Sequence, residues 1–121
     1  MKVCVIIPVF NEQDFIKKSV ESLIDQTIKP AEVIYVNDNS TDNSKNIIRN
    51  LIGNCEWIRV IDHKSVQEHV PGSKVIEAFN FGLKNLETQF DIICKFDGDI
   101  ILPKNYIEKI IEIFNEKEKV G

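Results

Sequence analysis

Short runs rich in β-branched residues alternate along the chain with segments whose apolar residues recur at helical spacing. The β-rich runs are residues 2–8, 32–37, 57–62 and 91–97. The last helical segment carries Ile107, Ile110, Ile111 and Phe114, the i, i+3, i+4, i+7 spacing of an amphipathic helix. Nearly continuous apolar strands that alternate with helices are typical of a parallel sheet buried on both faces. The sequence therefore predicts an α/β fold, with a mostly parallel, Rossmann-like sheet and helices on both faces.

Residues typical of helix starts precede the helical segments. They are Asn11, Ser40, Ser73 and Pro103. The one long irregular segment, residues 62–73, is expected to form a surface loop near a site. Its two histidines, His63 and His69, have no neighbouring ligand residues in the sequence and are expected at the surface.

Composition restricts the class of protein. A chain of 121 residues corresponds to about one domain. With a net charge of −4 and no dense Lys/Arg cluster, nucleic acid is not expected as a partner. The three cysteines lack metal-ligand spacing, which favours reduced thiols and a cytoplasmic location. The longest apolar run, residues 3–10, is far shorter than the roughly 20 residues that span a bilayer.

Three polar stretches follow three of the predicted strands. They are PVFNE at residues 8–12, NDNSTD at 37–42 and DGD at 97–99. In an open α/β sheet, ligands bind beyond the carboxyl ends of the strands. The three stretches are therefore expected to meet in one binding site.

Asp97 and Asp99 flank Gly98 where an apolar run stops. Two carboxylates separated by one small residue can share a hard divalent cation, Mg²⁺ or Mn²⁺, while glycine lets a ligand approach the backbone. Such a cation would leave positions for diphosphate oxygens and neutralise charge as a phosphate leaves. The alternative is a turn in which Asp97 caps the backbone and Asp99 is solvated.

Other polar residues at this edge also allow two interpretations. Asp38 could accept hydrogen bonds from a nucleobase N–H or ribose hydroxyls, or could cap a turn. Glu12 could contact a ribose or only begin a helix, and Asp42 is expected as a first-turn charge on the helix dipole. Pro8 ends its strand and exposes the backbone of residues 8–10.

Two lysines complete the set of candidates. Lys74 follows Pro71-Gly72-Ser73, so it could contact a phosphate at a helix start or could be solvated. Lys95 lies within a predicted strand and is expected to be a charge partner for nearby acids.

The stretches VIIPVFNE, VIYVNDNSTDNS and KFDGDIILP, in this order and spacing, resemble the N-terminal half of family 2 glycosyltransferases, which have the GT-A fold. The segment PGSKVIEAFNFGL is similar to the family helix that ends in N-x-G-L. The resemblance covers essentially all 121 residues. Two departures lie in the second motif, where Asn37 replaces an acid and Asn39 replaces a glycine. A third is IILP at residues 100–103, which differs from the LQHP of dolichyl-phosphate mannose synthases.

The resemblance implies particular roles. Asp38 would bind the base, Asp99 would ligate the metal directly, and Asp97 would touch ribose or metal. The full set implied to bind the nucleotide sugar is Pro8, Val9, Phe10, Glu12, Asp38, Lys74, Asp97 and Gly98, with Asp97 and Asp99 as the metal pair. The donor would be a UDP-, GDP- or dTDP-sugar and the acceptor a saccharide or lipid-linked hydroxyl, with inversion at the anomeric carbon.

The resemblance also implies how much of an enzyme these residues carry. Residues 1–121 correspond to the nucleotide-sugar-binding portion of a GT-A domain, with the acceptor half and the general base expected beyond residue 121. The chain alone is then expected to bind donor without transferring sugar, and to self-associate through uncovered apolar surface. The full-length protein could sit peripherally at the membrane.

Two other classes share some of these features. A receiver-type signalling domain is also doubly wound and binds Mg²⁺, but it needs an acidic pair where this chain has PVFNE. A nucleotidyltransferase would need a glycine-rich loop at the same place, and the sequence has none. Both are less consistent with the motifs than a sugar transferase.

Overall fold

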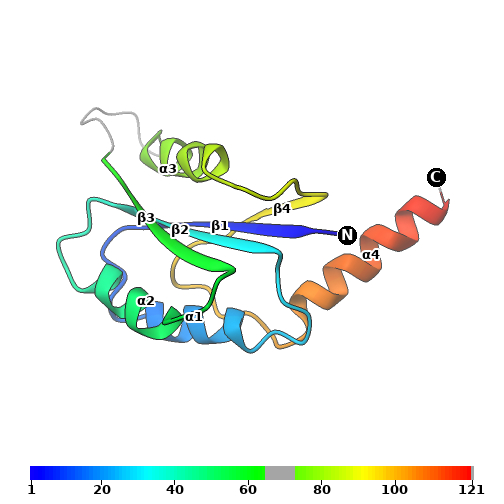
Figure 1. Cartoon of the computed structure of the whole chain (residues 1–121), viewed down its shortest axis with the longest axis horizontal. Helices are drawn as coiled ribbons and strands as arrows, with labels where there is room; N and C mark the ends of the chain where they lie inside the picture. The colour runs from blue at the N-terminus through cyan, green and yellow to red at the C-terminus, as the bar shows by residue number, and fades with distance from the viewer. Residues whose placement is uncertain (65–72, 121) are drawn as a thin grey trace.

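The computed structural model describes residues 1–64 and 73–120, with the backbone alone for residues 73 and 118–120. Strands and helices alternate along the whole chain (Figure 1). The elements are β1 (Val3–Val9), α1 (Ile16–Ile24), β2 (Glu32–Asp38), α2 (Ser44–Ile52), β3 (Ile58–His63), α3 (Ser73–Lys84), β4 (Ile92–Lys95) and α4 (Tyr106–Val120).

The strands form one sheet in the order β3-β2-β1-β4, and every pair is parallel. The predicted α/β class and parallel sheet are therefore confirmed. The strand boundaries differ from the predicted ones by one or two residues. β1 runs on to Val9, so Pro8 does not end its strand as predicted, and β4 ends at Lys95 rather than at Asp97. Asp97, Gly98 and Asp99 consequently belong to the loop that follows β4.

Helices cover both faces of the sheet, with α3 on one side and α1 and α2 on the other (Figure 1). Because side chains of a strand alternate between faces, Val5 and Ile7 of β1 join the core beneath α1 and α2. Ile6 points the other way and packs with Ile34 and Ala78 under α3. Odd or even position in β1 and β2 thus decides which layer a side chain meets.

Gly82 lets α3 approach the sheet closely. A Cβ atom at this position would lie 2.7 Å from Cγ2 of Ile6 and 2.9 Å from Cγ2 of Val36. Both neighbours are β-branched, so their methyl groups have little rotamer freedom with which to move away. The glycine of the N-x-G-L sequence therefore sets the spacing between α3 and the two central strands.

Gly82→Ala should destabilise the chain. Overpacking costs about 1–3 kcal/mol, against a gain of about 1 kcal/mol in helix propensity, so the free energy of unfolding should fall by up to about 2 kcal/mol. Urea unfolding followed by circular dichroism measures the change. Glu77→Ala, on the exposed side of α3, is the matched control and should not destabilise. A Gly82→Ala chain as stable as the wild type would contradict the close approach.

Two predicted helix starts are wrong. α1 begins at Ile16 and α2 at Ser44, later than Asn11 and Ser40 would place them. These two residues bond each other instead, because the Asn11 N–H donates to Ser40 Oγ at 3.0 Å. The start of α3 at Ser73 is as predicted, and α4 begins at Tyr106, just after Pro103.

The segment predicted as an irregular loop, residues 62–73, begins later than expected. Asp62 and His63 are the last residues of β3. Residues 65–72, with His69 among them, lie outside the described residues.

The loop after β4 is attached at both of its ends. At the start, the Phe96 N–H donates to the carbonyl of Ile6 at 3.2 Å. At the end, the Leu102 N–H donates to Ser22 Oγ at 3.1 Å. Buried Gln26 strengthens this second attachment, since its amide donates to the Pro103 carbonyl and accepts from the Ile107 N–H. Ser22 of α1 and Gln26, which follows the helix, therefore hold the chain between Asp99 and α4.

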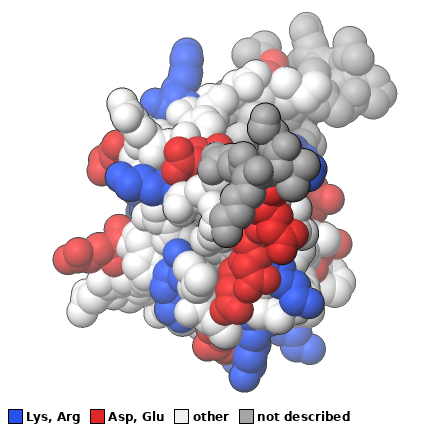
Figure 2. Space-filling view, turned by 90° about the vertical axis from the view of Figure 1, so that its right-hand side faces the viewer, with Lys and Arg blue, Asp and Glu red and all other residues white. Residues whose placement is uncertain are grey.

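The side of the molecule that carries α4 shows a strip of acidic side chains with basic ones beside it (Figure 2). Large apolar side chains are also exposed after β4 and on α4: Ile100, Ile101, Ile113 and Phe114. Self-association through this surface stays a prediction. Across residues 1–64 and 73–120, no helix has the length and apolar character needed to cross a membrane.

Candidate functional site

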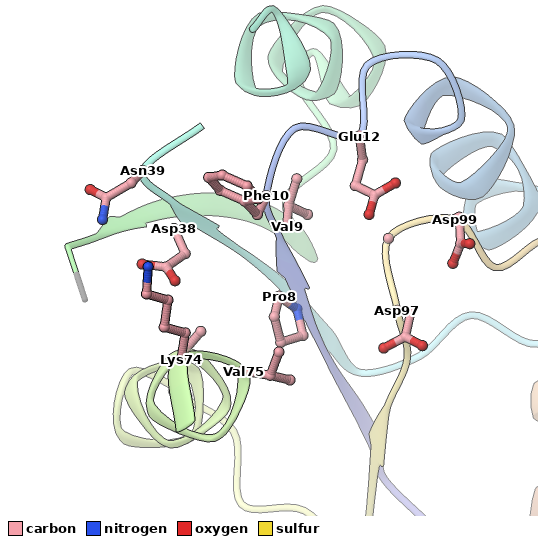
Figure 3. Close-up of a pocket in the computed structure, with 12 residues that line it drawn as sticks. Pro8, Val9, Phe10, Glu12, Asp38, Asn39, Lys74, Val75, Asp97 and Asp99 are labelled. Atoms are coloured by element: carbon pink, nitrogen blue, oxygen red, sulfur yellow. The ribbon is translucent and has the colours of Figure 1, made fainter. Parts of the chain in front are cut away.

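The loops after β1, β2 and β4, together with the first turns of α3, enclose one pocket of about 400 Å³ (Figure 3). It is lined by every residue that the resemblance implies for nucleotide-sugar or metal binding: Pro8, Val9, Phe10, Glu12, Asp38, Lys74, Asp97, Gly98 and Asp99. The other two candidates, Asp42 and Lys95, do not line it. Segments up to 91 residues apart in the chain thus meet at the carboxyl edge of the sheet (Pro8 to Asp99, 99 − 8). We call this cavity the edge pocket.

Three further residues line the edge pocket and were not nominated: Asn39, Val75 and Ala78. Val75 and Ala78 lie next to Lys74 and one helical turn beyond it, so helical spacing from Lys74 could have found them. Asn39 has φ 61°, the left-handed conformation that asparagine tolerates better than most side chains. Asn39 therefore adopts a backbone conformation that a glycine would also adopt readily.

The loops after β1 and β2 are joined through Asn11, which also has a positive φ, of 50°. Its side-chain oxygen accepts from the Thr41 N–H at 2.8 Å and the Asp42 N–H at 3.3 Å. In the same region the Glu12 N–H donates to Ser44 Oγ at 2.8 Å. These bonds fix Glu12 at the wall of the edge pocket.

Asp42 reinforces the same junction from outside the pocket. Its carboxylate accepts from the N–H and hydroxyl of Ser44, at the start of α2, and from the Gln13 N–H. Burial opposes its ionisation, but these hydrogen bonds outweigh burial and hold the pKa of Asp42 below its ordinary value. Asp42 lies two residues before α2, so the prediction that it sits in the first turn of the helix is wrong. It instead links the start of α2 to the loop after β1.

Glu12, Asp97 and Asp99 form an acidic group at the β4 side of the edge pocket (Figure 3). Gly98 is buried against them, and a Cβ there would lie 3.0 Å from Cγ of Glu12. Burial, followed by repulsion from Asp99, Asp97 and Asp42, raises the pKa of Glu12. Lys95 Nζ lies 3.8 Å from Asp97, the charge pairing predicted for this lysine.

This donor set is suited to a hard cation. Within residues 1–64 and 73–120, no group of three or more His, Cys, Asp or Glu side chains is arranged to hold a metal ion by itself. Asp97 and Asp99 supply carboxylate oxygens, which Mg²⁺ and Mn²⁺ prefer. A cation beside them would offset the repulsion that raises the pKa of Glu12, so the chemistry and charge of these residues fit such an ion.

Asn37 and Asp38 face opposite layers. The Asn37 amide donates to Asp62 at 3.1 Å, and Asp62 is paired with Lys45 of α2. Asp38 lines the edge pocket, and the Lys74 side chain extends from α3 toward it (Figure 3). Asn37, which stands where the family motif has an acid, therefore lies outside the pocket. Its substitution does not alter the pocket's wall.

His63 does not lie at the surface as predicted. It ends β3 beside Asp38, with its side chain 18% exposed, because the parallel register of β2 and β3 pairs the two residues. Its ring packs on Phe81 of α3, with the ring centroids 4.6 Å apart. The sequence signal for this position was the alternation of β3, which places His63 on the α3 side.

Known proteins share both the sequence and this arrangement. The family model described as glycosyl transferase family 2 matches residues 4–121. The chain belongs to glycosyl transferase family 2. Glycosyltransferase GlyA of Streptococcus pneumoniae is 31% identical over 92% of this chain.

Solved structures show the same fold. TarS of S. aureus, residues 1–349 in complex with UDP-GlcNAc, superposes with a TM-score of 0.76 and 25% identity over 96% of this chain. The mannosyltransferase PcManGT of Pyrobaculum calidifontis, in complex with GDP-Man and Mn²⁺, has a TM-score of 0.64 and 22% identity over 84% of the chain and 28% of its own. The GT-A-type fold is confirmed. The present chain spans 15% of the length of GlyA and 32% of that of the TarS chain.

Glu12→Gln should stabilise the ligand-free family 2 chain at neutral pH. The folded pKa of Glu12 is raised above its ordinary 4.5, so the folded state binds the proton more tightly than the unfolded state does. The energetic cost of ionisation is therefore absent at low pH and grows as pH rises through the folded pKa. The advantage of Glu12→Gln in urea unfolding should be largest at about pH 7 and vanish towards about pH 4.

Glu112→Gln, on the exposed side of α4, serves as the control for the loss of one carboxylate. It should show no comparable gain at any pH. An advantage of Glu12→Gln that stays constant across the pH range would contradict the electrostatic account of this site.

Proposed function

We propose that this chain carries the donor site of an inverting sugar transferase that uses a nucleotide diphosphate-sugar. The observation that carries the proposal is the convergence on the edge pocket of every residue that the resemblance implies for nucleotide-sugar or metal binding, in a member of family 2. The donor would be a UDP-, GDP- or dTDP-sugar. A saccharide or lipid-linked hydroxyl would attack the anomeric carbon as its bond to the diphosphate breaks.

The layout of the edge pocket supports one orientation of the donor. Asp38 and Lys74 lie on one side of Pro8, while Asp97 and Asp99 lie on the other (Figure 3). The base would lie towards Asp38, and the diphosphate towards the acidic pair. Lys74 points to Asp38, so we place it at the base and ribose rather than at the phosphates that the sequence suggested.

The wall between these ends is apolar and suits a nucleoside. Pro8 and Val9 of β1 line it together with Val75 and Ala78 of α3, and Val75 lies beside Pro8 (Figure 3). Phe10 lies at the same edge with 59% of its surface exposed, which leaves an aromatic face for a ligand. Pockets for small ligands combine such apolar walls with a few placed polar groups.

Asp97 and Asp99 would hold Mn²⁺ or Mg²⁺ together with diphosphate oxygens. The ion would supply charge neutralisation to the departing diphosphate. The Mn²⁺ present with GDP-Man in PcManGT supports this at the level of the fold. No residue of the edge pocket is assigned to the acceptor or to the base that deprotonates it. A cytoplasmic location also remains part of the proposal.

Removal of the metal, or of its main ligand, should weaken nucleotide binding. In the presence of Mn²⁺, Asp99→Asn should lower the affinity for the best-binding member of UDP, GDP and dTDP by about tenfold or more, since a hydrogen-bonded or ligated charge contributes roughly 1.5–3 kcal/mol. EDTA should lower the wild-type affinity to a similar level. Isothermal titration calorimetry measures both.

Glu112→Gln removes an acid from α4, away from the pocket, and should bind like the wild type. Equal wild-type affinity with Mn²⁺ and with EDTA would exclude the metal role. A wild-type chain that binds none of the three nucleotides would overturn the proposed donor site as a whole.

A further inference from the structure

Asp38, at the wall of the edge pocket, is paired with His63 behind that wall, and the proposed function gives His63 no role. They are register partners at the ends of β2 and β3, and Nδ1 of His63 lies 3.5 Å from Oδ1 of Asp38. The two side chains are only 18% and 8% exposed, respectively. Asp38 lines the pocket, whereas His63 does not.

The imidazole is held in a fixed position. Its ring packs on Phe81 of α3 at a centroid distance of 4.6 Å and an interplanar angle of 39°. Nδ1 is buried and has no hydrogen-bond partner among the described residues. Burying a polar nitrogen without such a partner costs folding free energy. The orientation of Nδ1 towards the Asp38 carboxylate therefore calls for a functional explanation.

The chemistry of the pair indicates that Nδ1 of His63 carries a proton. If Nδ1 were unprotonated, its lone pair would face the lone pairs of Oδ1 in a poorly solvated place, which is unfavourable. With the proton on Nδ1, the ring can donate to Asp38. The 3.5 Å separation is longer than the usual 2.7–3.2 Å of an N–H···O bond, so the ring and the carboxylate must approach by a few tenths of an ångström for the hydrogen bond to form.

On the basis of the proposed function, we propose that His63 is a positioning residue that orients the Asp38 carboxylate towards the donor's nucleobase. So oriented, Asp38 accepts from a ring N–H of the base. Uracil and thymine carry that N–H at N3 and guanine at N1, whereas the corresponding nitrogens of cytosine and adenine are acceptors and would face the carboxylate lone pairs. The pair therefore selects donors whose base has a ring N–H.

Two variants separate the hydrogen bond from the packing of the ring. His63→Phe keeps an aromatic ring against Phe81 but removes the donor. His63→Asn loses the ring but keeps an amide N–H near the position of Nδ1. Exposed Lys64, the next residue in the chain, gives Lys64→Ala as a control for local substitution. Thermal unfolding by circular dichroism checks that each variant folds.

Binding is measured by isothermal titration calorimetry with Mn²⁺ and three probes. The first is whichever of UDP, GDP and dTDP binds the wild type most tightly. The second is the same nucleotide methylated at the ring N–H, and the third is inorganic pyrophosphate. His63→Phe should bind the unmodified nucleotide about tenfold more weakly, the scale of one hydrogen bond to a charged group. His63→Asn should recover most of that loss, and Lys64→Ala should match the wild type.

The other probes show whether the effect runs through the base. The methylated nucleotide should bind the wild type weakly and lose little more in His63→Phe, and pyrophosphate should bind wild type and variants alike. Wild-type affinity in His63→Phe, equal losses in the Phe and Asn variants, or an equal loss for pyrophosphate would each overturn the positioning role and leave the donor site standing. A wild type that binds no nucleotide would overturn both.

Discussion

The hydrogen bonds that Asn11 makes to the loop after β2 are the interaction on which the site depends. The loops after β1 and β2 lie beyond the ends of their strands. Their backbone N–H and C=O groups therefore cannot form hydrogen bonds within the sheet. The Asn11 side chain supplies an acceptor for the N–H groups of Thr41 and Asp42, and its own N–H uses Ser40. A left-handed backbone at Asn11 and Asn39 makes this approach geometrically available. Glu12 and Asp38 are then held on neighbouring walls of one cavity.

Much of the fold and most of the pocket could be predicted from the sequence. The alternation of apolar runs with helical spacing is sufficient for a parallel sheet, and in such a sheet the strand ends must share an edge. The three polar stretches after the strands therefore had to meet. The same alternation of side chains explains why the change to Asn37 leaves the lining of the pocket unaltered, because residue 37 faces α2 and residue 38 faces α3.

What the sequence could not predict depends on contacts between distant segments. Asn11 and Ser40 are good helix-capping residues, but their partners lie in each other's loop, so both helices begin later. His63 is ordinary as a single residue, and its burial follows from the register of β3 against β2 and the docking of Phe81. Local propensity carries no information about either pairing.

The loop that carries Asp97 and Asp99 has little room for large movement, since both of its ends are fixed. β1 holds it at Phe96, and α1 holds it at Leu102 through Ser22. The hydrogen bond at each end limits the segment that can move to the residues between Phe96 and Leu102. Any accommodation of a bound molecule must then come from rotation about the few dihedral angles in between, with Gly98 the most permissive of them. The acidic pair thus lies on a short segment with two attached ends, and adjustments in fit fall to the dihedral angles of that segment and to side-chain rotamers.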